Sequence, residues 1–451
     1  MKRVKGERED LVQQGENNME IKELYDLYKE CGGISTDSRK IGKNSMFIAL
    51  KGDNFDGNDF AVAALEKGAK YVLVSKPSII EEASKIGRSS SVIVVGDTLK
   101  VMQDLACYHR KCFDIPVVAV TGTNGKTTTK ELIGAVLAKK YNVAITPGNL
   151  NNHIGVPLTL FGIDSRTEMA VVEMGASAPG EIDTLAKVAR PTCGLITSVG
   201  KAHLQGFGSF EGVKKAKGEL YNFLRQTGGV AFYNVDNEIL EDMIRARAGM
   251  KIVQYGRSLS DFPVQPVTVD EPFLRMGELK THLVGNYNAD NVLAAICVGR
   301  FFGVADKKIF EAVSQYVPSN NRSQMVKTEN NMLIVDAYNA NPTSMAASLD
   351  NFAATDFPDK VLILGDMLEL GDYSAQAHEE ILQKAAAISQ EIYLVGKSEF
   401  RNALQKTGIK AMHFETSAQL ADYFAEHPLK GKSILIKGSN GTRLTTVIEK
   451  L

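Results

Sequence analysis

The segment TGTNGKTT, residues 121–128, combines glycines, a lysine and threonines in an order that suits the binding of phosphate groups. The apolar run PVVAV (116–120) precedes it and predicts a strand, and KTTTKELIGAVLAKKY (126–141) predicts a helix. The start of such a helix offers free N–H groups and a partial positive charge. Lys126 would reach the terminal phosphates of a nucleoside triphosphate, and Thr127 would offer a hydroxyl to Mg²⁺.

This loop departs from the usual pattern G-x-x-x-x-G-K-[ST] at one position, where Val120 stands in place of the first glycine. An ordinary glycine-rich turn between a strand and a helix is the alternative interpretation. The coincidence of G-K-T with a strand before it and a helix after it favours the phosphate loop. Gly122 and Gly125 would then allow the backbone to approach the phosphates closely.

Three further side chains downstream could take part in chemistry, two of them at the same edge of a sheet. Glu173 ends the apolar run MAVVEM (169–174), where its carboxylate could hold Mg²⁺ that bridges a nucleotide. His203 follows the next predicted strand, and Lys217 lies in a helical segment rich in lysine. The alternatives are a solvated strand-end glutamate, a structural histidine and a solvated lysine.

Composition places the chain in a broad class before any fold is considered. Of its 451 residues 44% are hydrophobic and 23% charged, which is typical of a globular protein with proper cores. The net charge of −1 gives no basic field for nucleic acid or a membrane surface. Five scattered cysteines and the lack of an apolar run of ~20 residues favour a reduced, cytoplasmic setting without a membrane span.

Short apolar runs alternate with helical segments along most of the chain, which predicts the α/β class with parallel sheets. We expect a polar, disordered extension at residues 1–18 and domains at 19–112, 113–317 and 318–451. The first is a small α/β domain, the second a doubly wound parallel sheet carrying the phosphate loop, and the third a Rossmann-like domain. Residues 258–285 are shorter, alternating and proline-bearing, and they predict a small antiparallel insert. The predicted strands include MFIAL (46–50), YVLVS (71–75), SVIVVG (91–96), NVAIT (142–146), CGLITSV (193–199), GVAFYN (229–234), KIVQYG (251–256), MLIVDA (332–337), KVLILGD (360–366), EIYLVG (391–396) and SILIKG (433–438).

Several longer segments resemble the Mur ligase family from about residue 20 to the end of the chain. They are STDSRKIGKNSMFIALKGDNFDGNDF (35–60), TGTNGKTTTKE, TPGNLNNHIGVPLTL (146–160), VVEMGAS (171–177), AHLQGFGSFEGVKKAKGEL (202–220), GNYNADNVLAA (285–295), NRSQ (321–324), DAYNANPTSM (336–345), LGDMLELG (364–371) and KGSNGTRL (437–444). The resemblance implies a first domain that binds a UDP-sugar, a central ATP-binding domain and a C-terminal ligase domain.

The resemblance also implies roles for individual residues. Asn288 could instead be only a helix N-cap, and the asparagines near 150 could be only an Asn-rich turn. The implied roles, motif by motif, are as follows: the ATP loop at Gly122, Thr123, Asn124, Gly125, Lys126, Thr127 and Thr128; adenine contacts at Asn288 and Asn291; nucleotide contacts from the last domain at Arg322 and Asp336; Mg²⁺ ligands at Thr127 and Glu173; a second metal site at Glu173, His203 and a carbamylated Lys217; the UDP-sugar pocket at Ser38 and Arg39; and substrate contacts at Asn149 and Asn152.

The implied activity is ATP-dependent formation of an amide bond, with Lys126, Glu173, His203 and Lys217 as the catalytic set. DAYNANPTSM and GDMLELG favour the family member that joins D-Ala-D-Ala to the C-terminal carboxylate of UDP-MurNAc-tripeptide through an acyl phosphate. The third residue of the tripeptide, diaminopimelate or lysine, stays open. The alternatives are another amide ligase, such as a folylpolyglutamate-type enzyme, or a phosphate-loop ATPase without ligase activity. Nothing in the sequence calls for more than a monomer.

Overall fold

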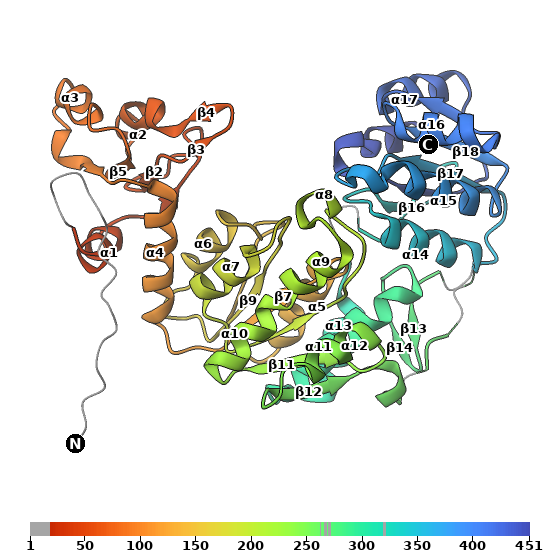
Figure 1. The fold of residues 1–451 in the computed structure, drawn as a ribbon, viewed down its shortest axis with the longest axis horizontal. Coiled ribbons are helices and arrows are strands. Elements are labelled where there is room, and N and C mark those ends of the chain that lie inside the picture. The colour runs from red at the N-terminus through yellow and green to blue at the C-terminus, as the bar shows by residue number, and fades with distance from the viewer. Residues whose placement is uncertain (1–18, 262, 266–267, 269–271, 319–321) are drawn as a thin grey trace.

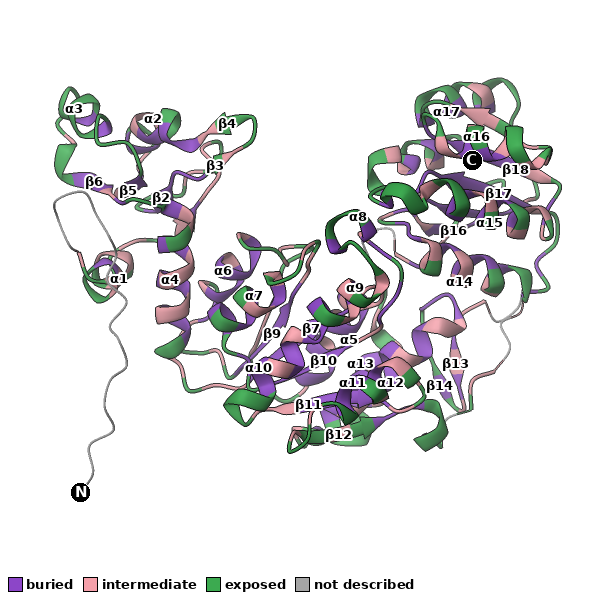
Figure 2. Ribbon diagram, viewed as in Figure 1, coloured by how far each residue is buried: buried purple, intermediate pink, exposed green. Residues whose placement is uncertain are grey.

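The computed structural model describes residues 19–261, 263–265, 268, 272–318 and 322–451, and it divides into three lobes (Figure 1). The predicted disordered extension at 1–18 lies outside the described residues. The middle lobe joins the other two, and buried strands run through the centre of each lobe (Figure 2). The protein is therefore of the α/β class with three domains, as the sequence predicts.

The first lobe is built on a small parallel sheet in the order β1-β2-β5-β6. Apolar runs form its inner strands because both faces of the sheet are covered. A two-stranded antiparallel pair, β3 with β4, lies beside it. The elements are α1 (Ile21–Lys29), β1 (Ile34–Ser35), β2 (Met46–Ile48), β3 (Lys51–Gly52), β4 (Phe55–Asp56), α2 (Ala61–Glu66), β5 (Tyr71–Val74), α3 (Ile79–Ser84), β6 (Val92–Val94) and α4 (Thr98–Lys111).

The middle lobe holds a six-stranded, wholly parallel sheet in the order β12-β11-β10-β7-β9-β8. Separate apolar clusters cover its two faces, which is the doubly wound arrangement. Its elements are β7 (Val117–Thr121), α5 (Lys126–Leu137), β8 (Val143–Ile145), α6 (Gly155–Leu160), β9 (Met169–Glu173), α7 (Glu181–Ala189), β10 (Cys193–Ile196), α8 (Leu204–Phe207), α9 (Phe210–Lys217), α10 (Glu219–Thr227), β11 (Val230–Asn234), α11 (Glu238–Arg245), β12 (Lys251–Tyr255), β13 (Arg275–Met276), β14 (Leu279–Lys280), α12 (Ala289–Phe301) and α13 (Asp306–Gln315).

The last lobe contains a second six-stranded sheet, in the order β15-β16-β20-β17-β18-β19. Only the edge strand β15 runs antiparallel to its neighbour, and the other pairs are parallel. Its elements are β15 (Gln324–Lys327), β16 (Met332–Asp336), α14 (Pro342–Ala353), β17 (Lys360–Gly365), α15 (Ser374–Ala386), β18 (Glu391–Val395), α16 (Glu399–Thr407), β19 (Met412–Phe414), α17 (Ser417–Glu426) and β20 (Ser433–Lys437).

Helix α4 links the first two lobes and is bonded firmly to the second (Figure 1). The ring Nε2–H of His109 donates to the carbonyl of Ile163 at 2.9 Å. The guanidinium of the buried Arg110 donates to the carbonyl of Ala189 at 3.2 Å. Since α1 packs against the same helix, α4 belongs to both lobes at once.

The described elements confirm the predicted strands and the antiparallel insert, where β13 pairs with β14. Five strands were not predicted from the sequence: β1, β3, β4, β15 and β19. Each is short, and the edge strands β15 and β19 are only partly buried, so they lack a continuous apolar run. The domain boundaries at 112/113 and 317/318 remain a prediction. None of the helices in the described part of the chain is long and apolar enough to cross a membrane.

Candidate active site

The loop at residues 121–125 leaves the end of β7 and leads straight into α5. Its glycines are needed for both conformation and space. Gly122 has φ +144°, and a Cβ there would come within 2.1 Å of the Thr197 hydroxyl. Gly125 has φ +81°, and a Cβ there would lie 2.6 Å from the side-chain oxygen of Asn291. The backbone is therefore shaped as a phosphate loop requires, although Val120 breaks the usual pattern.

Lys126 lies folded across this loop. Its ammonium donates to the carbonyls of Gly122 at 2.8 Å and Thr123 at 3.0 Å. Burial lowers the pKa of Lys126 to about 8, while the nearby Glu173 carboxylate opposes that shift. A polyphosphate in the loop would offer the ammonium stronger, charged acceptors than these carbonyls.

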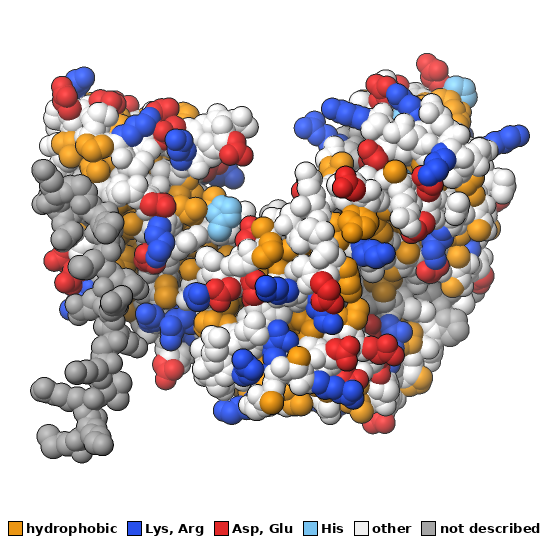
Figure 3. Space-filling model, viewed as in Figure 1, with side chains coloured by type: hydrophobic (Ala, Val, Ile, Leu, Met, Phe, Trp, Pro, Cys, Tyr) orange, Lys and Arg blue, Asp and Glu red, His pale blue; other side chains and the backbone are white. Residues whose placement is uncertain are grey.

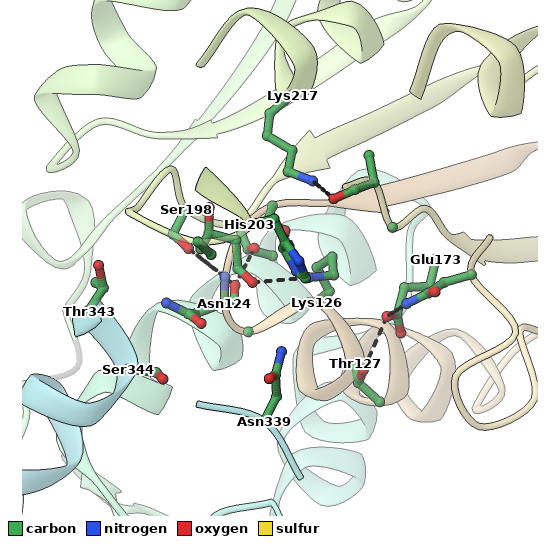
Figure 4. Close-up of a pocket in the computed structure, with 18 of the residues that line it drawn as sticks. Asn124, Lys126, Thr127, Glu173, Ser198, His203, Lys217, Asn339, Thr343 and Ser344 are labelled. Carbon is green, nitrogen blue, oxygen red and sulfur yellow. Dashed lines mark hydrogen bonds between the residues drawn. The ribbon is translucent and has the colours of Figure 1, made fainter. Parts of the chain in front are cut away.

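Glu173 lies at the end of β9 and is wholly buried, with 0% of its surface exposed. Its Oε1 accepts hydrogen bonds from the Asn151 amide at 2.7 Å and the Thr127 hydroxyl at 3.2 Å (Figure 4). Its Oε2 is buried and accepts no hydrogen bond from the described residues. The interpretation of Glu173 as a solvated strand-end residue is therefore wrong. An unsatisfied carboxylate oxygen beside a hydroxyl is a donor set that fits Mg²⁺.

Lys217 and His203 line the same cavity as Glu173, which has a volume of about 980 Å³. Lys217 is only 2% exposed, so the solvated-lysine interpretation is wrong. Its ammonium donates to the carbonyl of Ala176 at 3.3 Å, and burial lowers its pKa to about 7. Figure 4 shows it reaching down into the cavity from above Lys126.

His203 precedes α8 with a left-handed backbone, φ +50°. Its Nδ1 contacts the carboxylate of Glu369, which belongs to the last lobe. Among the described residues, no group of three or more His, Cys, Asp or Glu is placed to hold a metal ion. The second metal site of Glu173, His203 and a carbamylated Lys217 stays a prediction.

Asn288 and Asn291 lie at the start of α12 and are both buried. The Asn291 amide donates to the Asn288 side-chain oxygen at 2.8 Å, and the Thr129 hydroxyl donates to Asn291 at 2.9 Å. Asn288 occupies the N-cap position but makes no side-chain capping bond. The pair is instead bonded to the phosphate-loop helix α5, which places both residues beside the loop.

The last lobe supplies the other side of the cavity (Figure 4). The guanidinium carbon of Arg322 lies 3.6 Å from the centre of the Tyr338 ring, and its Nε is buried without a hydrogen-bond partner among the described residues. Asp336 ends β16, where its carboxylate accepts from the Lys437 ammonium at 2.5 Å. Asn341, which caps α14, donates to the side chain of Asn124 in the loop at 2.8 Å.

The predicted substrate residues are not gathered in this cavity. Arg39 has a side chain 85% exposed and pairs with Asp37, and neither it nor Ser38 lines the cavity. Asn149 is exposed and also lies outside the lining. Asn152 does line it, but its side-chain oxygen accepts from the Gly155 N–H at 2.8 Å, which supports the turn interpretation. Figure 3 shows a broad notch between the first and last lobes.

Several residues with site contacts were not predicted from the sequence, among them Asn151, Lys130, Asn341 and Glu369. Two had a usable signal: Asn151 stands between two predicted asparagines, and Lys130 lies inside the motif TGTNGKTTTKE. Asn341 and Glu369 also stand within quoted motifs, but only the folded chain brings them to the middle lobe.

Comparison with known families covers most of the chain. The model of the Mur ligase family catalytic domain matches residues 30–110, that of the Mur ligase middle domain matches 120–299, and that of the Mur ligase glutamate ligase domain matches 321–440.

Individual relatives match over nearly their full length. The UDP-N-acetylmuramoyl-tripeptide–D-alanyl-D-alanine ligase of Bacillus subtilis is 36% identical over 439 residues, covering 93% of each chain. The protein of the same name from Escherichia coli is 33% identical over 437 residues, again with 93% of each covered. A crystal structure of MurF from Acinetobacter baumannii has a TM-score of 0.82 at 27% identity and covers 96% of this chain and 98% of that one. MurF ligase from Thermotoga maritima, in complex with ADP, has a TM-score of 0.80 at 26% identity, covering 94% and 97%.

Proposed function

Because this chain belongs to the Mur ligase family, we propose that it joins D-Ala-D-Ala to the C-terminal carboxylate of UDP-MurNAc-tripeptide at the expense of ATP. One observation carries the proposal: the phosphate loop, the buried Glu173 and residues of the last lobe all line a single cavity. A nucleotide, a carboxylate and an amine must meet in such a cavity for an amide ligation. The products are ADP, phosphate and UDP-MurNAc-pentapeptide, a precursor of peptidoglycan.

The reaction needs ATP because a carboxylate offers an amine no adequate leaving group. An oxygen of the tripeptide carboxylate attacks the γ-phosphorus, the bond to the β-phosphate oxygen breaks, and ADP leaves. The amine of D-Ala-D-Ala then attacks the carbonyl carbon of the acyl phosphate and gives up a proton. The tetrahedral intermediate collapses with release of phosphate. The protein contributes mainly position and charge, so no nucleophilic side chain is required.

We assign the phosphate-handling roles from the contacts in the cavity. Lys126 exchanges its loop carbonyls for phosphate oxygens and balances the charge that develops on the γ-phosphoryl group. Thr127 and Glu173 would hold Mg²⁺, which supplies positive charge to the β- and γ-phosphates when bound. Asn288 and Asn291 lie where the adenine would bind, and Arg322 and Asp336 approach the nucleotide from the last lobe.

We propose that Lys217 carries a carbamate in the active enzyme. Its amine is buried at the cavity wall, and its hydrogen bond to the Ala176 carbonyl is long, at 3.3 Å. The neutral amine can attack CO2 and lose a proton, which replaces a buried cation with two oxygens. Those oxygens would complete a second metal site with Glu173 and His203.

Growth or incubation with ¹³C-bicarbonate should give one carbamate signal in the NMR spectrum of the active enzyme. The signal should vanish in Lys217→Met and persist in Lys215→Met, since Lys215 lies exposed on the same helix. An active enzyme whose intact mass and spectrum show an unmodified Lys217 would rule the carbamate out.

The proposed activity is tested by a phosphate-release assay in which each substrate is omitted in turn. We expect turnover only with ATP, UDP-MurNAc-tripeptide and D-Ala-D-Ala together, because the acyl phosphate forms on one substrate and is consumed by another. Phosphate release that is indifferent to the dipeptide would instead identify an ATPase without ligase activity. Parallel assays with diaminopimelate- and lysine-containing tripeptides would identify the third residue.

We also propose that the enzyme acts as a monomer in the cytoplasm. One chain supplies the phosphate loop and the residues that face it from the last lobe, so the cavity needs no second copy. ATP and a nucleotide-linked sugar are both cytoplasmic metabolites.

A further inference from the structure

Lys130 is a buried lysine to which the proposed reaction has so far given no role. It lies one turn beyond Lys126 on α5, is 1% exposed, and does not line the cavity. Placing an ammonium in the interior is costly unless its donors are satisfied. An apolar side chain such as Met would fill similar space without that cost, so the bonds that Lys130 makes need an explanation.

Those bonds hold the segment that follows β8. The Lys130 ammonium donates to the carbonyl of Thr146 at 2.9 Å and to that of Gly148 at 3.0 Å. The Thr146 hydroxyl in turn accepts the backbone N–H of Glu173 at 3.0 Å. Lys130 thus ties the phosphate-loop helix to the strand end that carries the buried carboxylate.

The same segment continues to Asn151, which forms a second hydrogen-bonded contact with Glu173. The Asn151 amide donates to Glu173 Oε1, and its carbonyl accepts the N–H of Gly175 at 2.7 Å. Gly175 fits closely there, because a Cβ would come within 2.8 Å of the Asn151 side chain. The segment 146–151 therefore positions the Glu173 carboxylate, and Lys130 holds the start of that segment.

Lys130 also provides a positive charge near the carboxylate. Its ammonium lies 3.8 Å from Glu173 Oε2, which is too far for a hydrogen bond but close enough for attraction. It lies equally far, 3.8 Å, from Glu131. Oε2 therefore stays free of hydrogen bonds, while Glu173 itself lines the cavity.

We propose that Lys130 is a positioning residue for the reaction: by bonding the segment 146–151 it aims the Glu173 carboxylate, with Oε2 free, at the cation that accompanies ATP. The inference rests on the proposed function for its meaning, but its test does not need turnover. Lys130 acts through Glu173 and contacts neither nucleotide nor substrate.

The direction of a change in cation affinity separates this role from two others. Mn²⁺ binding would be measured by electron paramagnetic resonance in the presence of ADP, for the wild type and Lys130→Met. A positioning role predicts affinity weaker by about tenfold to 100-fold, as for other groups that orient a ligand. A role of charge alone predicts tighter binding, because a cation is removed beside the site. A role in folding alone predicts unchanged affinity with a lower melting temperature. Either of these last two results would overturn the proposal.

Matched variants keep the comparison interpretable. Lys130→Arg, which retains the charge and the donors, should recover most of the affinity. Lys139→Met removes a lysine just beyond the same helix, where it pairs with Glu311 near the surface, and should bind Mn²⁺ as the wild type does. If Lys130→Met does not fold, Lys130→Gln, whose side chain ends one atom short of the two carbonyls, should still bind Mn²⁺ more weakly than the wild type. If the wild type binds Mn²⁺ and ADP but needs no dipeptide for turnover, the ligase assignment is refuted. The positioning role of Lys130 is not affected by that result.

Discussion

Replacing Lys126 with alanine should lower kcat/KM for the ligation by about 10³-fold or more, in the range found when a single charged contact to a reacting phosphoryl or oxyanion is removed. The lysine is the cation that the loop itself offers to the terminal phosphates. Its ammonium donates hydrogen bonds to two loop carbonyls, which phosphate oxygens can replace. The measurement is steady-state phosphate release with all three substrates present. Because the loss falls on the transition state, raising the ATP concentration should not restore the rate.

This variant should stay folded, since it removes a partly buried cation whose hydrogen bonds remain within one loop. A melting temperature close to that of the wild type would confirm it. Lys140→Ala is the matched control: this exposed lysine lies just beyond the same helix, where it donates to the Gly303 carbonyl, and its loss should leave kcat/KM unchanged. Turnover within a few-fold of the wild type for Lys126→Ala would remove the phosphate loop from the mechanism.

Replacing Glu173 with glutamine should lower kcat by about 10²-fold to 10³-fold, because one negative ligand of the cation site is lost while the shape of the side chain is kept. The glutamine carbonyl can still accept the bonds from Asn151 and Thr127, so the local structure should survive. The Mg²⁺ concentration needed for half-maximal turnover should rise at the same time. Titrating Mg²⁺ at saturating substrates measures both effects.

Glu168→Gln provides the control, since Glu168 precedes the same strand at its opposite end and is exposed. Its carboxylate accepts only a backbone N–H, from Asn142, among the hydrogen bonds of the described residues. It should leave both kcat and the Mg²⁺ requirement unchanged. An unaltered Mg²⁺ requirement in Glu173→Gln would mean that Glu173 is a structural acceptor for Asn151 and not a cation ligand.

The strands that position the site could be predicted because parallel strands covered on both faces appear as continuous apolar runs. PVVAV and MAVVEM show this, and both form buried strands of the middle sheet. The edge strands β15 and β19 could not be found in this way, because their sequences, QMVK and MHF, are short and contain polar residues.

The candidate site was predictable where its residues follow strands or fall in a spaced motif, as Lys126, Thr127 and Glu173 do. The environment of Lys217 was not, because Lys215 beside it is exposed and only the packing of α9 buries one of the two. The contact between His203 and Glu369 joins residues 166 positions apart in different lobes. No local sequence pattern predicts this contact, because it depends on how the last lobe packs against the middle lobe.

Helix α4 bears on the spacing between the first two lobes (Figure 1). Its 14 residues span about 21 Å at the rise of an α-helix, and His109 and Arg110 bond its far end to the middle lobe. The separation between the first lobe, where the sequence predicts the UDP-sugar to bind, and the phosphate loop is then set by a spacer of fixed length. A UDP-linked peptide held by the first lobe would present its terminal carboxylate to ATP only if its own length fits that gap. The length of α4 would thus restrict which peptide lengths can react, independently of how their side chains are recognised.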